Sequence, residues 1–181
     1  MARIARFLTL IALTFATPVA FAASDDIAGS KDHPLLTRYP DSILTEYEQN
    51  FNSVPITVGV ESGAPKIQNI DGQATLIRYF YRDAAKQPSP LQIIRNYQNA
   101  IKAINGEVVF ERLPKEGDGG ETTLKVNTGG KDVWIKVEPD IWSAPTQSYK
   151  LAIVEVEAMT QVISANALLD ALNKDGFIAL Y

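Results

Sequence analysis

Four strand-like segments follow one another in the second half of the chain, and short turns separate them. Their residues are 107–113, 121–127, 131–139 and 149–159. Each segment is rich in branched and aromatic side chains, and Thr128-Gly129-Gly130 is typical of a tight hairpin turn. Because parallel strands need long crossover connections, strands this closely spaced must pair antiparallel.

Three earlier segments have strand character as well. Residues 54–60 alternate apolar and polar side chains, and residues 73–83 are rich in aromatic and branched residues. Residues 43–47 are expected to form a short first strand. Residues 61–65 are expected to form a turn, and Asp71-Gly72 is expected to form another just before the strand at 73–83.

The clearest helix signal covers residues 89–106. Ser89 is the expected N-cap, Pro90 occupies the first helical position, and Gln92 completes a capping box. Apolar residues recur at spacings of three and four and form one stripe: Leu91, Ile94, Tyr97, Ile101 and Ile104. A second helix is expected at residues 165–175. The sequence therefore predicts an α+β fold, in which an antiparallel sheet carries one or two helices on one face.

Residues 1–22 have the organisation of a secretory signal peptide. Arg3 and Arg6 form the positive region, an apolar run follows, and Ala20-Phe21-Ala22 is a typical cleavage site. The apolar run is shorter than the ~20 residues that a membrane-spanning helix needs. We therefore predict cleavage after Ala22, no transmembrane helix in the mature chain, and a periplasmic location.

The mature chain is expected to contain one domain. Residues 23–42 are polar and rich in turn-forming residues, which indicates an extended arm. Residues 43–181 are long enough to bury a single core without disulfides. The last five residues, 177–181, are all apolar or aromatic, so they are predicted to close the sheet or to precede an absent C-terminal domain.

Charge and cysteine content exclude several classes of function. Loss of two arginines with the signal peptide lowers Lys+Arg from 17 to 15 against 21 Asp+Glu, which gives a mature net charge of −6. A nucleic-acid partner is therefore not expected, because phosphate binding needs a basic surface. The chain has no cysteine, which excludes disulfides, a thiol nucleophile and a cysteine-based zinc site.

The candidate catalytic groups all have a simpler structural interpretation. His33 is the only histidine, and it lies in the arm without a nearby nucleophile motif, so a solvated or capping role is preferred. Glu155 and Glu157 share one face of a strand and are interpreted as solvated, while the opposite face of that strand is expected to be the core: Ala152, Val154, Val156 and Ala158. The glycine-rich stretches lack the residues of a phosphate or calcium loop and are predicted to be turns. No catalytic residue, metal ligand or cofactor is predicted.

Aromatic and basic residues on polar strand faces are the candidate binding residues. They are Trp134, Trp142, Phe80, Arg78 and Arg82. Trp134 alternates with apolar residues and shares the polar face of its strand, and Phe80 lies between the two arginines, which favours a partner-binding patch. The competing interpretation is that the second helix or the arm covers these rings.

The chain also resembles a known family at both ends of its mature part. Residues 26–48 (DIAGSKDHPLLTRYPDSILTEYE) resemble the start of certain secreted OmpA-family proteins, and residues 177–181 (FIALY) resemble the entry to their C-terminal OmpA-like domain. In that family the C-terminal domain binds peptidoglycan. We expect no counterpart of that domain within residues 1–181, so none of its ligand-binding residues is assigned to a position of this sequence.

These observations together predict a non-catalytic accessory domain of a cell-envelope protein, near the outer membrane. Its expected partner is an envelope protein or a peptidoglycan-associated protein. One alternative is a periplasmic carrier that binds a lipid or a small apolar ligand in a cavity between helix and sheet, lined by Tyr79, Tyr81, Tyr97 and Ile101. Another is a hydrolase that uses His33.

Overall fold

The computed structural model describes residues 25–140, 147–157, 169–170 and 172–174. Its elements are β1 (Ile43–Glu61), β2 (Ala64–Phe80), the 3₁₀ turn η1 (Ala84–Lys86), α1 (Pro90–Ala103), β3 (Glu107–Arg112), β4 (Glu121–Thr128), β5 (Lys131–Asp140) and β6 (Ser148–Glu155). The signal peptide, the segment with Trp142 and the predicted strand at 177–181 lie outside the described residues. Of the predicted second helix, residues 169–170 and 172–174 are described, and they are helical.

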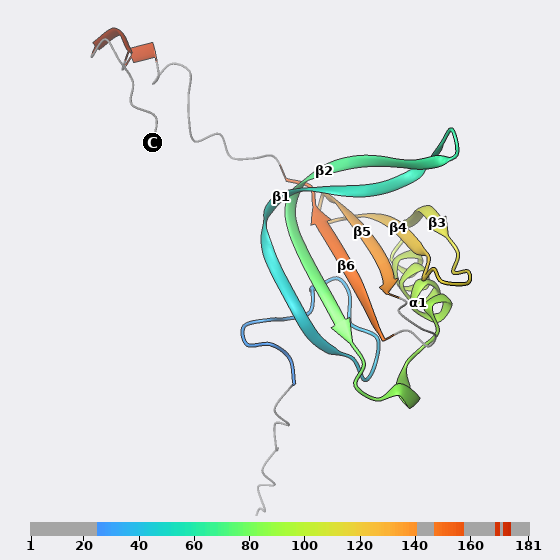
Figure 1. The fold of residues 1–181 in the computed structure, drawn as a ribbon. Coiled ribbons are helices and arrows are strands. Elements are labelled where there is room, and N and C mark those ends of the chain that lie inside the picture. The colour runs from blue at the N-terminus through green and yellow to red at the C-terminus, as the bar shows by residue number, and fades with distance from the viewer. Residues whose placement is uncertain (1–24, 141–146, 158–168, 171, 175–181) are drawn as a thin grey trace, which may run out of the picture.

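The six strands form one sheet with the order β1-β2-β6-β5-β4-β3, and every neighbouring pair is antiparallel (Figure 1). The antiparallel pairing was predicted correctly, but the α+β class is wrong, because the fold is mainly β. The strands predicted at 43–47 and 54–60 are one strand of 19 residues, and β2 adds a further 17. A long hairpin therefore occupies residues that the prediction divided into short strands and turns.

The main core lies on the face of the sheet that packs against α1, which we call the inner face. Ile77 of β2, Ile135 of β5 and Ile153 of β6 are buried there in one cluster with residues of the helix. Leu36 of the arm is buried in the same cluster, so the arm closes one end of this core. The otherwise irregular arm is thereby fixed to the domain.

Helix α1 begins as the sequence predicts. Ser89 and Gln92 form the capping box, with Pro90 at the first position. The predicted stripe is correct in its centre only: Ile94, Tyr97 and Ile101 are buried, whereas Leu91 and Ile104 are exposed. The two ends of the helix extend beyond the part of the sheet that it covers.

The end of the β1–β2 hairpin that carries the turn crosses the opposite face of the sheet. We call this face the outer face. We name this segment, residues 54–72, the strap; in Figure 1 it passes over the upper end of the sheet towards β4 and β3. A second, smaller cluster lies beneath it: Val54, Ile56, Ile70, Ala74 and Val154. Both faces of β6 are therefore buried in this region.

This arrangement corrects the predicted orientation of β6. The expected core face, with Val154 and Val156, is instead the outer face, and Val156 is exposed. The main core is formed by the face with Leu151 and Ile153. Ala158, the last member of the predicted core face, lies outside the described residues. Because the strap covers one face of β6 and the helix side of the sheet covers the other, β6 carries apolar residues on both faces. The alternation of apolar and polar residues along this strand therefore could not show which face belongs to the main core.

Asp71-Gly72 is not the predicted turn but lies within β2, where the strap leaves the sheet. A Cβ atom at Gly72 would clash with the backbone carbonyl of Glu155. Glycine is therefore needed at this position for the close approach of two strands rather than for a turn. The predicted turn at 61–65 is correct: Ser62 and Gly63 join β1 to β2 with positive φ angles, as a tight hairpin requires.

Candidate functional site

Three of the predicted binding residues lie on the outer face of the sheet. Arg78 and Phe80 extend from β2 and Trp134 from β5, each alternating with side chains that belong to the main core. Arg82 follows β2 and is exposed, with its Nη1 2.6 Å from Asp25. Trp142 lies outside the described residues. The outer face is therefore where a binding site must be sought.

Arg78 lies in an open groove of about 360 Å³ on the outer face, which we call the Arg78 groove. It is lined by Glu46, Tyr47, Glu48, Leu76, Ile77, Arg78, Glu138, Lys150, Leu151 and Ala152. The guanidinium group of Arg78 lies 3.1 Å from Glu46 and 3.3 Å from Asp140, and Lys150 lies 3.6 Å from the same aspartate. The lining combines apolar side chains with three acidic and two basic ones, which suits a mixed partner surface better than a single anion.

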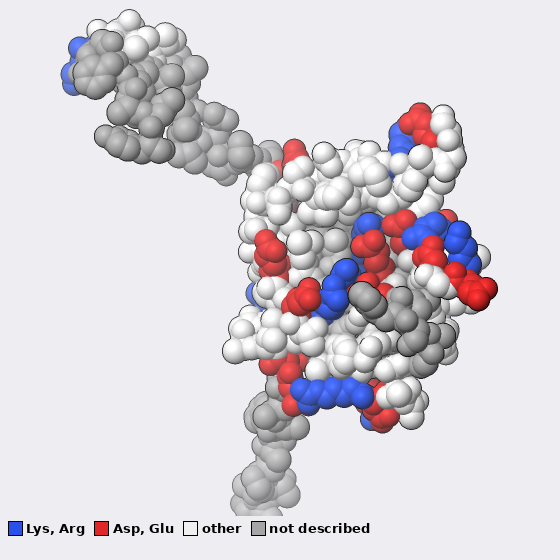
Figure 2. All heavy atoms as spheres, in the orientation of Figure 1, with Lys and Arg blue, Asp and Glu red and all other residues white. Residues whose placement is uncertain are grey.

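The charges of this face extend beyond the Arg78 groove. Lys136 of β5 lies 2.9 Å from Glu138 and 3.4 Å from Glu121, and Glu121 lies 3.3 Å from Arg112 of β3. On the face shown in Figure 2, acidic and basic groups are interspersed rather than separated into patches of one sign. Such a surface does not attract a polyanion as a basic patch would.

Trp134 is half-buried and packs against the cluster beneath the strap. The ring is therefore partly covered, as the competing interpretation expected, but by the strap rather than by a helix or the arm. Its remaining surface faces a second open groove of about 490 Å³, which we call the Trp134 groove. This groove is lined by Gln68, Asn69, Ile70, Asp71, Lys125, Asp132, Trp134, Val156 and Glu157. The two grooves share no lining residue, so Arg78 and Trp134 do not form one site.

His33 is buried, and both of its ring nitrogens are engaged. Nε2 lies 3.1 Å from the carboxylate of Glu155, and Nδ1 accepts a hydrogen bond from the backbone N–H of Leu35 at 3.2 Å. Neither nitrogen is left to activate a hydroxyl nucleophile, which general-base catalysis would require. His33 thus connects the arm to β6. It is buried and not solvated, and its bond with the N–H of Leu35 is a local capping contact.

Glu155 and Glu157 are both paired with the same lysine. The ammonium group of Lys131 lies 3.6 Å from Glu155 and also contacts Glu157. The two carboxylates therefore take part in ion pairs with one shared lysine, as solvated strand residues commonly do. Among the described residues, no group of three acidic or histidine side chains is close enough to hold a metal ion.

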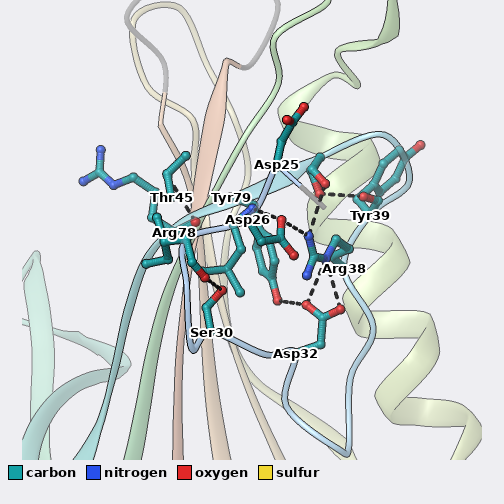
Figure 3. Close-up of polar contacts among 12 residues, drawn as sticks. Asp25, Asp26, Ser30, Asp32, Arg38, Tyr39, Thr45, Arg78 and Tyr79 are labelled. Atoms are coloured by element: carbon teal, nitrogen blue, oxygen red, sulfur yellow. Dashed lines mark hydrogen bonds and ion pairs between the residues drawn. The ribbon is translucent and has the colours of Figure 1, made fainter. Parts of the chain in front are cut away.

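The densest polar network joins the arm to the first two strands and was not predicted from the sequence (Figure 3). Arg38 donates hydrogen bonds to Asp26 at 2.7 Å and to Asp32 at 3.0 Å, and the hydroxyl of Tyr79 donates to Asp32 at 2.7 Å. Asp26 also accepts from the backbone N–H of Leu44 on the edge strand. The hydrogen bond from Arg38 lowers the pKa of the Asp26 carboxyl, and the pKa of Arg38 is raised in turn.

Every charged group of this network already has a partner within it, so we assign it a structural role. It attaches the arm to β1 and covers the start of an edge strand. Asp26, Asp32 and Arg38 lie in an arm that forms neither helix nor strand, so no local pattern pairs them and only the tertiary structure could reveal the network.

None of the described helices has the length and apolar character to span a membrane. No protein-family model matches the chain, and no curated protein matches it significantly. The outer face, with its two grooves, therefore stands as the candidate site on its geometry alone.

Proposed function

We propose that the protein is a non-catalytic interaction domain that is exported to the periplasm and binds a cell-envelope partner through the outer face of its sheet. The observation that supports this most directly is the Arg78 groove. It combines an apolar floor, formed by Leu76 and Ala152, with a rim of both charge signs. Protein–protein contact surfaces have this composition, since an apolar centre is desolvated while polar groups at the rim give specificity.

The envelope location depends on the sequence. Residues 1–22 have the form of a signal peptide, and residues 26–48 resemble the start of secreted OmpA-family proteins. In such a protein this domain would position or regulate a neighbouring wall-binding domain. The partner is then an envelope protein or a protein associated with peptidoglycan.

The carrier alternative is less well supported. The side chains expected to line its cavity, Tyr79, Tyr81, Tyr97 and Ile101, are at most 4% exposed and pack together in the main core. Tyr97 also contacts a groove between the arm and α1, but that groove is open and only about 340 Å³. A lipid chain would need an enclosed apolar space, which these residues do not form.

Export can be tested by expressing the natural gene with a C-terminal tag in its own host and fractionating the cells. We expect the tagged protein in the periplasmic fraction with Ala23 as its first residue. A protein that keeps residues 1–22 and stays with the cytoplasm would contradict the location.

Partner binding can be tested in the same cells with a photo-reactive amino acid. Glu48, on the rim of the Arg78 groove, is the test position, and Asn99, exposed on α1, is the matched control. We expect one specific envelope protein to be cross-linked from Glu48 and not from Asn99. Equal labelling from both positions would remove the support for this surface.

A further inference from the structure

We propose that the Trp134 groove binds a neutral, polyhydroxylated ligand of the size of a short oligosaccharide. This inference rests on the proposed function, because it takes the outer face to be a binding face. It goes further by assigning a ligand class to the second groove. The Trp134 groove is larger than the Arg78 groove, and the strap, β4 and β5 all contribute to its walls.

The floor of the groove offers an aromatic surface. Sugar rings present a face of C–H groups that packs on such a surface, while their hydroxyls bind polar groups at the side. Trp134 is held in place by the cluster beneath the strap, so its ring is fixed before a ligand arrives. A preorganised aromatic platform lowers the entropy cost of binding.

The rim supplies the polar groups that hydroxyls require. Gln68, Asn69 and Asp71 of β2 are exposed, and all three line the groove. Amides both donate and accept hydrogen bonds and a carboxylate accepts them, which matches the mixed donor and acceptor character of a hydroxyl. All three side chains are exposed on the strap, where a hydroxyl of a ligand in the groove can reach them.

Charge and depth argue against the other classes of small ligand. Asp71, Asp132 and Glu157 give the groove more acidic than basic side chains, since Lys125 is the one basic residue that lines it. An anionic ligand would therefore be repelled. The groove is also open and has a polar rim, whereas a lipid needs a deep apolar cavity.

Lys125 is the one group that competes for the ring. Its ammonium lies 5.1 Å from the centre of the Trp134 ring and 2.8 Å from Asp132. Exposed cation–π and ion-pair contacts of this kind are each worth about 1 kcal/mol or less. A ligand that stacks on the ring can therefore displace Lys125 at small cost.

The test is an NMR titration of the folded mature chain with maltotetraose, cellotetraose and chitotetraose, following the indole N–H signals. Trp142→Phe leaves Trp134 as the single tryptophan. We expect at least one of these neutral probes to shift the Trp134 signal saturably, while a tetrasaccharide of galacturonic acid does not. No saturable shift from any neutral probe at millimolar concentration, or a shift from the acidic probe alone, would overturn the proposal.

Variants then locate the ligand. The double variant Gln68→Ala, Asp71→Ala changes exposed side chains only, and we expect it to weaken oligosaccharide binding about tenfold. Glu48→Ala, on the rim of the Arg78 groove, should leave oligosaccharide binding unchanged. Lys125→Ala should bind at least as tightly as the natural chain. Undiminished binding by the double variant would contradict the proposed rim. If the oligosaccharides fail while cross-linking from Glu48 succeeds, this inference is wrong and the proposed function stands.

Discussion

At the scale of single residues, a glycine within a strand determines where the hairpin leaves the sheet. Gly72 faces the backbone of Glu155 at the point where β2 continues beyond its partner β6. Gly59, in the same hairpin, has open space where its Cβ would be, and its φ angle lies outside the left-handed region. The same substitution at these two glycines therefore adds a methyl group to a crowded site in one case and to open space in the other.

We predict that Gly72→Ala lowers the free energy of unfolding by about 1–3 kcal/mol, because the added methyl group forces two strands apart. Gly59→Ala is the matched control and should leave stability unchanged or raise it by up to about 1 kcal/mol, since it only restricts the unfolded chain. Urea unfolding of both variants measures the difference. Equal stability of the two variants would show that β2 and β6 are not in close contact at Gly72.

At the scale of elements, the strap is attached to the sheet by few contacts. Apart from its small apolar cluster, it is held by Thr57, whose hydroxyl donates to Glu121 at 3.1 Å and whose carbonyl accepts from Thr123 at 2.6 Å. Glu121 is buried and is paired with Lys136 and Arg112. Besides the apolar cluster and the Thr123 hydrogen bond, the position of the strap therefore depends on one buried carboxylate, that of Glu121.

We predict that Glu121→Ala releases the strap before the rest of the domain unfolds, because truncating one partner of a buried ion-pair network leaves the others uncompensated. Trypsin cleavage after Lys66, near the exposed tip of the strap, should then become at least ~10-fold faster through local opening. Glu138→Ala is the control: it removes a half-exposed partner of Lys136 that does not touch Thr57. If both variants are cleaved at the same rate, Glu121 does not hold the strap.

At the scale of the whole molecule, a cluster of tyrosines joins the sheet, the helix and the arm. Tyr149 of β6 is central: its ring lies 4.9 Å from that of Tyr79 and 5.9 Å from that of Tyr97. Its hydroxyl contacts the hydroxyl of Tyr97 at 3.1 Å and accepts from the backbone N–H of Tyr39 in the arm. Burial raises the pKa of Tyr79, Tyr81, Tyr97 and Tyr149 above the ordinary value of 10.

This cluster predicts that the domain unfolds in alkali. A tyrosine whose pKa is raised in the folded state stabilises the fold fully below pH 10, and that contribution is lost as the pH rises further. Each fully shifted tyrosine adds a slope of about 1.4 kcal/mol per pH unit above that value. Urea unfolding at pH 8, 10 and 11 should show this loss, and Tyr97→Phe should make it shallower. Constant stability from pH 8 to 11 would contradict the burial of these hydroxyls.

The sequence by itself determined the local structure. The capping box at Ser89, the Gly129-Gly130 turn and the antiparallel order of the later strands each depend on residues a few positions apart, so they could be predicted correctly. Arg78, Phe80 and Trp134 were also placed on polar strand faces, because alternation along a strand is a local property.

Only the tertiary structure decided how these pieces meet. The strap covers Val154, His33 reaches Glu155, and Arg38 binds Asp26 and Asp32, through contacts that no local period encodes. The fold class was mispredicted for the same reason, because the pairing that joins β1 and β2 into one long hairpin cannot be seen in either segment alone. Burial of a face depends on what packs against it, and that partner lies far away in the sequence.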